Sequence, residues 1–167
     1  RRRGKVDESS RISAEADSSY KQPIAYSVVI NPREKLIFAY QRADSKEHYH
    51  ESRLAGNYSW GFGGHVEEKD EDTSSNYTTL DIIKKSRDRE LEEEIIMSRN
   101  TRPLFIGYIN DDSNSVGRVH FGLVYFIETQ NKVTLNSSEG RIAFWKSIDE
   151  LEDICRDASR KDSGIKV

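Results

Sequence analysis

Apolar and polar positions in two short segments near the N-terminus predict a β-hairpin. Residues 25–30 and 35–40 are rich in aliphatic and aromatic side chains, and an Asn-Pro pair between them is typical of a turn. By contrast, residues 1–19 contain only two large aliphatic side chains among many charged and serine residues, which predicts a flexible polar tail. The folded domain is therefore expected to cover residues 20–167.

A longer segment, from about Leu80 to Met97, predicts a helix with one buried side. Thr78 precedes it and stands three positions before Asp81, which is the spacing of a weak capping box. Apolar side chains recur along one side of the segment, at Ile83, Leu91 and Ile95, with Arg87 between them.

The remaining apolar runs predict further strands and a second helix. Residues 118–128 give the strongest strand signal, and their later half is apolar on both faces, so this strand is expected to be central. Shorter strands are expected at residues 104–109, 133–135 and 141–145. A capping box from Ser147 to Glu150 opens a helix that runs to about Arg160. The irregular alternation predicts an α/β (α+β) fold with a mixed β-sheet flanked by helices.

Composition narrows the class of protein. The chain has 167 residues, enough for one domain, with 35% hydrophobic and 33% charged residues and a net charge of −3. This charge gives no electrostatic case for a nucleic-acid partner, and no apolar run approaches the length of a membrane span. Because Cys155 is the single cysteine and has no internal partner, a reducing, cytoplasmic setting is expected.

Three glutamates in the predicted helix are the most informative feature. Glu90, Glu93 and Glu94 stand at i, i+3 and i+4, so they share one side of the helix. Like charges at this spacing repel and destabilise a helix. A divalent cation explains their grouping better, since hard cations such as Mg²⁺ prefer oxygen ligands and often bring phosphate with them.

Together with an upstream Gly-rich segment, these glutamates resemble the Nudix box, G-x5-E-x7-R-E-U-x-E-E-x-G-U, where U is a bulky aliphatic residue. Gly64 takes the opening glycine, and residues 89–94 read Arg-Glu-Leu-Glu-Glu-Glu and take R-E-U-x-E-E. The lead-in of residues 60–67, the hairpin, the long strand and the C-terminal helix also resemble the family, over about residues 20–154. The resemblance implies the Nudix α/β/α sandwich.

The sequence departs from the box in two ways. Gly64 and Arg89 are 25 positions apart, 11 more than in the family pattern, and the extra residues fall in an acidic, Ser/Thr-rich loop. The first glutamate of the box then has no clean equivalent, and either Asp70 or Asp81 is a candidate. Ile95 stands where the box has glycine, so the helix is expected to run on past it.

The resemblance implies roles for particular residues. The side-chain metal ligands would be Glu90, Glu93 and Glu94, and the Gly63 carbonyl would add a backbone ligand. Arg89 would orient a glutamate rather than touch the substrate.

Two kinds of residue are candidates for the general base: a glutamate of the box and an acid in a later loop. The candidates are Glu93 and Glu94 in the helix and Glu139, which reads equally well as a turn residue. Substrate contacts are expected from Gly64, Glu67 and Phe62, although an aromatic residue such as Phe62 is more often part of the core.

The implied activity is hydrolysis of a pyrophosphate bond in a nucleoside diphosphate linked to another moiety, with Mg²⁺ or Mn²⁺ as cofactor. The expected partner is a small nucleotide or other diphosphate substrate, and a homodimer stays open. The alternative is a catalytically weak module that binds nucleotides on the same fold. Four histidines add little: His48 and His50 form a weak His-x-His signal, His65 lines the site or packs beside it, and His120 reads as a sheet residue.

Overall fold

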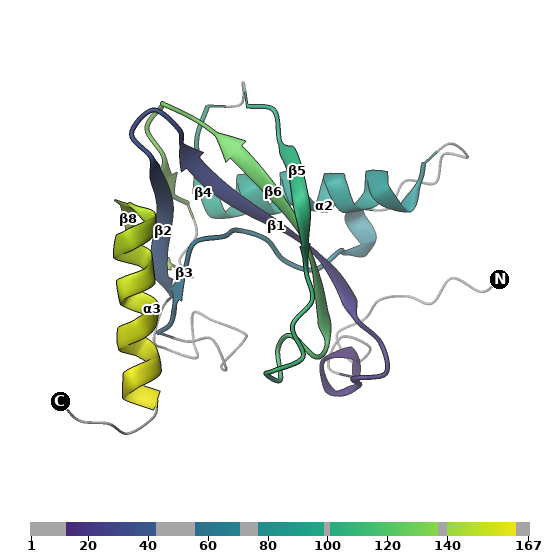
Figure 1. The fold of residues 1–167 in the computed structure, drawn as a ribbon. Helices are drawn as coiled ribbons and strands as arrows, with labels where there is room; N and C mark the ends of the chain where they lie inside the picture. The colour runs from purple at the N-terminus through teal and green to yellow at the C-terminus, as the bar shows by residue number, and fades with distance from the viewer. Residues whose placement is uncertain (1–12, 43–55, 71–76, 99–100, 137–139, 163–167) are drawn as a thin grey trace.

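The computed structural model describes residues 13–42, 56–70, 77–98, 101–136 and 140–162. Its main sheet has strand order β3-β2-β1-β6-β5, and β8 pairs with β2 beside this path (Figure 1). A separate pair, β4 and β7, lies off the main sheet. The strands are β1 (Gln22–Asn31), β2 (Leu36–Arg42), β3 (Tyr58–Ser59), β4 (Ile95–Ile96), β5 (Leu104–Ile109), β6 (His120–Glu128), β7 (Thr134–Leu135) and β8 (Gly140–Lys146).

The predicted hairpin and the central strand are confirmed. β1 and β2 pair antiparallel where they meet, with Asn31 opposite Leu36. β6 pairs parallel with β1 along its whole length and antiparallel with β5, so it is an interior strand. Because both of its faces are covered, its later half can be apolar on each side.

Helix α2 (Thr79–Glu94) carries the glutamates. The predicted capping box is present: the Asp81 backbone N–H donates to Thr78 Oγ1 at 3.3 Å, and Asp81 Oδ2 accepts from the Thr78 backbone N–H at 3.1 Å. Ile83 and Arg87 are buried as expected, and the Arg87 guanidinium lies 4.7 Å from the centre of the Tyr125 ring of β6. This contact lets a charged residue occupy a buried position on the helix.

The expectation that the helix runs past Ile95 is wrong. Ile95 is extended, with φ −136° and ψ 151°, and it pairs with Leu135 of β7 while its side chain joins the core. The Asn136 backbone N–H donates to the Glu94 carbonyl at 2.8 Å, and Asn136 Nδ2 donates to the Glu92 carbonyl at 3.2 Å. These bonds satisfy carbonyls at the helix end, so no glycine cap is required.

Two groups of buried side chains hold the layers together. One joins β1 and β6 to α2, through Ala25, Leu123, Tyr125 and Ile83. The other lies where β1, β2 and β6 meet the β4–β7 pair, and its buried members are Val29, Phe38, Tyr40, Phe62, Ile95, Ile127 and Val133. Ile95 therefore anchors the C-terminal end of α2 to the second group.

The C-terminal helix α3 (Ile148–Asp162) lies alongside β2 and β8, on the other side of the molecule from α2 (Figure 1). Its capping box is confirmed, since the Glu150 backbone N–H donates to Ser147 Oγ at 3.3 Å and Glu150 Oε2 accepts from the Ser147 N–H at 2.9 Å. The mixed sheet with flanking helices confirms the predicted fold class. In the described part of the chain, neither the length nor the hydropathy of any helix suits a membrane span.

The described structure begins at residue 13, ahead of the predicted start of the domain at residue 20. Residues 13–16 are helical, and Glu15 Oε1 lies 2.9 Å from His65 Nε2. Polar contacts hold this segment in place, and the pattern of apolar residues along the chain does not reveal such contacts. Residues 1–12 of the predicted tail, and the predicted base Glu139, lie outside the described residues.

Candidate active site

The Gly-rich segment lies against β1, between the strand and helix α2. Backbone bonds join Ser27 and Phe62 in both directions, at 2.7 and 2.8 Å, and a further bridge joins Ile24 to His65. Gly63 has φ +154°, and a Cβ there would collide with the Ala25 carbonyl oxygen. Only glycine allows the segment to approach the strand this closely.

Gly64 brings the segment against the helix. A Cβ at this position would collide with the carboxylate of Glu90, so the absence of a side chain lets Glu90 lie directly on the backbone of the loop. Ser86 Oγ donates to the His65 carbonyl at 3.3 Å and adds a second link between helix and loop. The opening glycine and the first glutamate after Arg89 are therefore neighbours in space.

Arg89 organises the site by binding Asp70. Its Nε and Nη2 donate to the two Asp70 carboxylate oxygens at 2.8 and 2.9 Å, and Nη2 also donates to the His65 carbonyl at 2.8 Å. Asp70 is 1% exposed. Its burial raises its pKa, but the hydrogen bonds from Arg89 and from the Glu67 backbone outweigh burial and hold the pKa below the ordinary value. The pair fixes the loop to the helix.

This geometry separates the two candidates for the first acid of the box. Asp70 contacts Arg89, whereas Asp81 caps the start of α2 and pairs with Lys84 at 3.6 Å. An aspartate has a shorter side chain than glutamate. The 3-10 turn η2 (Glu68–Asp70) nevertheless brings its backbone close enough for a bidentate contact with the guanidinium.

The remaining acids gather around the same guanidinium. Arg89 Nη1 lies 2.7 Å from Glu90 Oε1, 3.1 Å from Glu93 Oε2 and 3.5 Å from Glu67 Oε1. Lys69 Nζ pairs with Glu67 at 3.2 Å and with Glu93 at 3.1 Å. We call these residues the acidic cluster: Glu67, Asp70, Glu90 and Glu93, around Arg89.

Glu90 is the strained member of the acidic cluster. Its side chain is 13% exposed, and this burial raises its pKa. Arg89 favours its charged form, but the negative charges of Glu93 and Glu67 oppose it, and the net pKa lies above the ordinary value. A half-buried carboxylate with further acids beside it is a donor set that suits a hard divalent cation.

The predicted ligands are only partly brought together. Glu90 and Glu93 share Arg89, but the carboxylate oxygens of Glu90, Glu93 and Glu94 do not gather within 4.8 Å of one another in the described part of the chain. Glu94 is the last residue of α2, and its charge helps to raise the pKa of Tyr26, which burial raises most. Arg89 binds both Glu90 and Glu93, and Lys69 also binds Glu93.

The position of the Phe62 side chain does not favour its predicted contact with the substrate. The side chain is 1% exposed and lies between Phe38 and Tyr40, with ring centroids 5.8 and 5.1 Å away. It is therefore a core residue that holds the Gly-rich segment down. Glu67, by contrast, has a side chain 41% exposed at the edge of the acidic cluster, and Gly64 faces Glu90.

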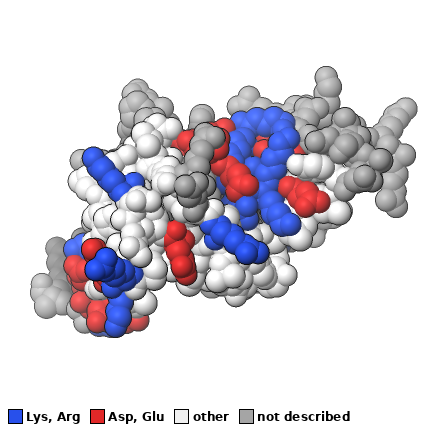
Figure 2. All heavy atoms as spheres, turned by 90° about the horizontal axis from the view of Figure 1, so that it is seen from above, with Lys and Arg blue, Asp and Glu red and all other residues white. Residues whose placement is uncertain are grey.

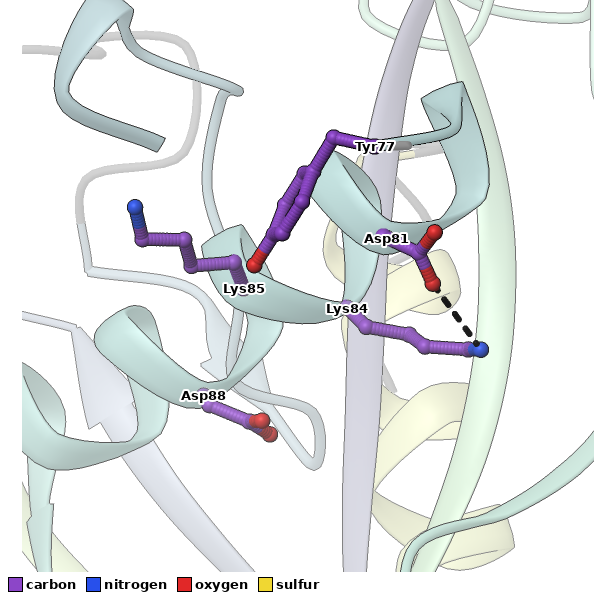
Figure 3. A pocket seen from close by; sticks show the side chains of 5 residues that line it. All are labelled: Tyr77, Asp81, Lys84, Lys85 and Asp88. Carbon is purple, nitrogen blue, oxygen red and sulfur yellow. Dashed lines mark ion pairs between the residues drawn. The ribbon is translucent and has the colours of Figure 1, made fainter. Parts of the chain in front are cut away.

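Sequence reasoning missed Lys69, although its place just after the lead-in, between Glu67 and Asp70, was a usable signal. It also did not anticipate a surface hollow of about 340 Å³ on α2, lined by Tyr77, Asp81, Lys84, Lys85 and Asp88 (Figure 3). The acidic cluster does not line this hollow. Seen from above, Lys and Arg side chains gather over the middle of one face with Asp and Glu beside them (Figure 2).

The fold and the box geometry define the class of protein. The structure superposes on Tm1382, assigned to the Nudix hydrolases, with a TM-score of 0.63 and 27% identity, covering 86% of this chain and 67% of Tm1382. It also superposes on the Nudix domain of Shewanella oneidensis NrtR, solved with ADP-ribose, with a TM-score of 0.55, 12% identity, and 89% and 88% of the two chains. The chain therefore has the Nudix fold and is similar in structure and sequence to a Nudix hydrolase.

Among particular proteins, the chain is similar to Protein YmaB of Bacillus subtilis (strain 168). The two are 35% identical over 146 residues, which cover 85% of this chain and 66% of YmaB. The chain thus spans slightly less than two thirds of the length of that relative. A scan against protein-family models gives no match.

Proposed function

We propose that this chain is a Mg²⁺-dependent hydrolase that cleaves a pyrophosphate bond in a nucleoside diphosphate linked to another moiety. The observation that carries the proposal is Glu90, which is half-buried beside Gly64, has Glu93 and Glu67 close by, and has a raised pKa. A cation would relieve the repulsion among these carboxylates. The similarity to a Nudix hydrolase supports the same reaction class.

Glu90, Glu93, Glu94 and the Gly63 carbonyl would hold the ion. Bound there, Mg²⁺ would neutralise phosphate charge, orient the phosphates and acidify a water molecule. Mn²⁺ prefers similar oxygen donors and would serve the same residues. Because the cation's charge would also favour the ionised form of Glu90, the raised pKa of this side chain is consistent with a ligand.

In this proposal Arg89 positions the carboxylates of the acidic cluster. Its bidentate contact with Asp70 fixes the guanidinium, and Nη1 then fixes the Glu90 and Glu93 carboxylates at 2.7 and 3.1 Å. The base that removes a proton from the attacking water would be Glu94, Glu93 or Glu139. Glu94 is a candidate through its place at the end of α2, on the same side of the helix as Glu90.

The test is a screen of nucleoside diphosphate derivatives with Mg²⁺, comparing the native chain with Glu93→Gln and Glu94→Gln. We expect kcat to fall by several orders of magnitude in at least one variant, because a ligand or the base is lost. Glu92→Gln is the matched control, since Glu92 lies on the same helix with an exposed side chain and points off the shared side. It is expected to keep activity close to native.

Native rates in both Glu93→Gln and Glu94→Gln would contradict the proposed mechanism. The alternative, a Nudix-fold module that binds nucleotides without turnover, predicts a different result. In that case the native chain would bind a nucleotide in calorimetry and release no phosphate at any pH. ADP-ribose is a suitable first ligand, because the Nudix domain of NrtR was solved with it.

A further inference from the structure

A second group of metal-ligating side chains lies beside the Gly-rich segment. Glu15 Oε1 is 2.9 Å from His65 Nε2 and 3.0 Å from His120 Nε2, and the two Nε2 atoms are 3.0 Å apart. We call these three residues the histidine cluster. Its ligand atoms form a nearly equilateral triangle, and the three side chains are only 22%, 20% and 14% exposed.

The histidine cluster joins three segments that are far apart in the sequence. Glu15 comes from the helical segment 13–16, His65 follows the glycine pair, and His120 opens β6. The His65 ring also packs edge-on against the His120 ring, with centroids 5.0 Å apart. The cluster shares no side chain with the proposed Mg²⁺ site.

A hydrogen bond outside the triangle fixes the orientation of His120. Its Nδ1 lies 2.8 Å from the Val116 carbonyl oxygen, which can only accept, so Nδ1 carries a proton. In neutral His120 the Nε2 atom then presents its lone pair to the Glu15 carboxylate 3.0 Å away. Two acceptors at this distance repel, so a positive charge is needed between them, either a proton or a metal ion.

The geometry favours a metal ion. Histidine ligands of zinc commonly donate their other ring N–H to a backbone carbonyl, as His120 does to Val116. Ligand atoms about 2.0–2.1 Å from a tetrahedral zinc ion are about 3.3 Å apart, so the observed triangle would open by only a few tenths of an ångström. Imidazole nitrogens suit zinc and its first-row neighbours and do not suit Mg²⁺.

We propose that Glu15, His65 and His120 bind one Zn²⁺ ion, with a fourth position left for water or another ligand. The ion would tie segment 13–16 and β6 to the Gly-rich segment. His65 connects the two sites, because its carbonyl accepts from Arg89 Nη2 at 2.8 Å. Zinc binding would therefore steady the loop against which Glu90 rests, without any zinc ligand belonging to the acidic cluster.

The test uses the full chain after a chelator has removed bound metal. Excess Mg²⁺ is then added, so that Mg²⁺ rather than the probe ion occupies the acidic cluster. Co²⁺ is added as a spectroscopic probe and then displaced by Zn²⁺. We expect one equivalent of Co²⁺ with the strong visible absorption of four-coordinate cobalt, and its loss on adding zinc. Glu15→Gln and His120→Gln are each expected to weaken binding by at least about a hundredfold, because each removes a ligand.

One control separates this site from others. Glu93→Gln should bind Co²⁺ like the native chain, since Glu93 does not belong to the histidine cluster. Circular dichroism of each variant checks the fold, and Glu15→Gln keeps the size of the side chain that it replaces.

The proposal is overturned if the native chain binds no Zn²⁺ at micromolar concentrations, which would leave a proton as the bridging charge. It is also overturned if Glu15→Gln and His120→Gln both bind as tightly as the native chain, or if Glu93→Gln abolishes binding. None of these readouts depends on hydrolysis, so the outcome is independent of the proposed function.

Discussion

The acidic cluster and the histidine cluster both contact the same short loop through His65, and they are built in opposite ways. The acidic cluster comes from one helix and the turn before it, and its carboxylates converge on the internal cation Arg89. The histidine cluster comes from three segments up to 105 positions apart in the chain. The first is visible in a local motif, and the second exists only once β6 and segment 13–16 meet the loop.

The two clusters also differ in the cation that suits them. Oxygen donors with a raised carboxylate pKa suit a hard ion such as Mg²⁺, and two imidazoles with one carboxylate suit zinc. His65 lies between them, with its ring in one cluster and its carbonyl bound to Arg89 in the other. The loop can therefore place two chemically distinct sites next to each other.

The largest expected change in stability comes from removing Arg89, the residue at the centre of the acidic cluster. Arg89→Ala leaves Asp70 buried without its partner, and we expect the free energy of unfolding to fall by about 3–5 kcal/mol. Arg89→Lys should recover little of this loss, because an ammonium group cannot make the bidentate contact. Urea denaturation measures both. A loss in Arg89→Ala no larger than that of an exposed control such as Arg156→Ala would contradict the central role of this pair.

A smaller effect shows how the acidic cluster depends on pH. The folded-state pKa of Asp70 lies below its ordinary value of 3.8, so its contribution to stability is present above that value and is lost as the pH falls through the lower, folded-state pKa. Asp70→Asn should therefore be less stable than the native chain by about 1–3 kcal/mol at pH 7, where Arg89 loses its charged acceptor. The difference should narrow below pH 4. Denaturation curves across this range test it, and a gap that stays constant down to pH 2 would argue against a lowered pKa.

The smallest expected effect is a gain in stability, which comes from replacing Glu90. The folded-state pKa of Glu90 is raised above 4.5, so its contribution to stability is lost as the pH rises through the folded-state value, and the ionised side chain is destabilising at neutral pH. Glu90→Gln should raise Tm by about 2–4 °C at pH 7 in chelator, while it removes a proposed Mg²⁺ ligand. Adding Mg²⁺ should then stabilise the native chain more than the variant. Equal Tm values in chelator would show that Glu90 is not under electrostatic strain.

Much of the fold was predictable because its signals are local. The hairpin, the capping boxes at Thr78 and Ser147, and strand β5 follow from patterns of a few residues, and the structure confirms them. The end of α2 was not predictable from such a pattern. Ile95 leaves the helix because Leu135 and Asn136 arrive from a later part of the chain to pair with it and to satisfy the carbonyls of the helix end.

The candidate site divides in the same way. The spacing of Glu90 and Glu93 places both on one side of a helix, so their proximity follows from helix geometry alone. Asp70 could not be separated from Asp81 by counting, because the loop between Gly64 and Arg89 is longer than the family pattern. Phe62 looked available for a substrate until Phe38 and Tyr40 of β2 were seen to enclose it.

The sequence by itself determined the Nudix resemblance, the helix with its glutamates and the glycines beside it, because these depend on contacts between residues near one another in the chain. Only the tertiary structure decided which acid holds Arg89, where α2 ends, and that Glu15, His65 and His120 meet. Those outcomes depend on sheet pairing between distant segments, whose register no short stretch of sequence encodes.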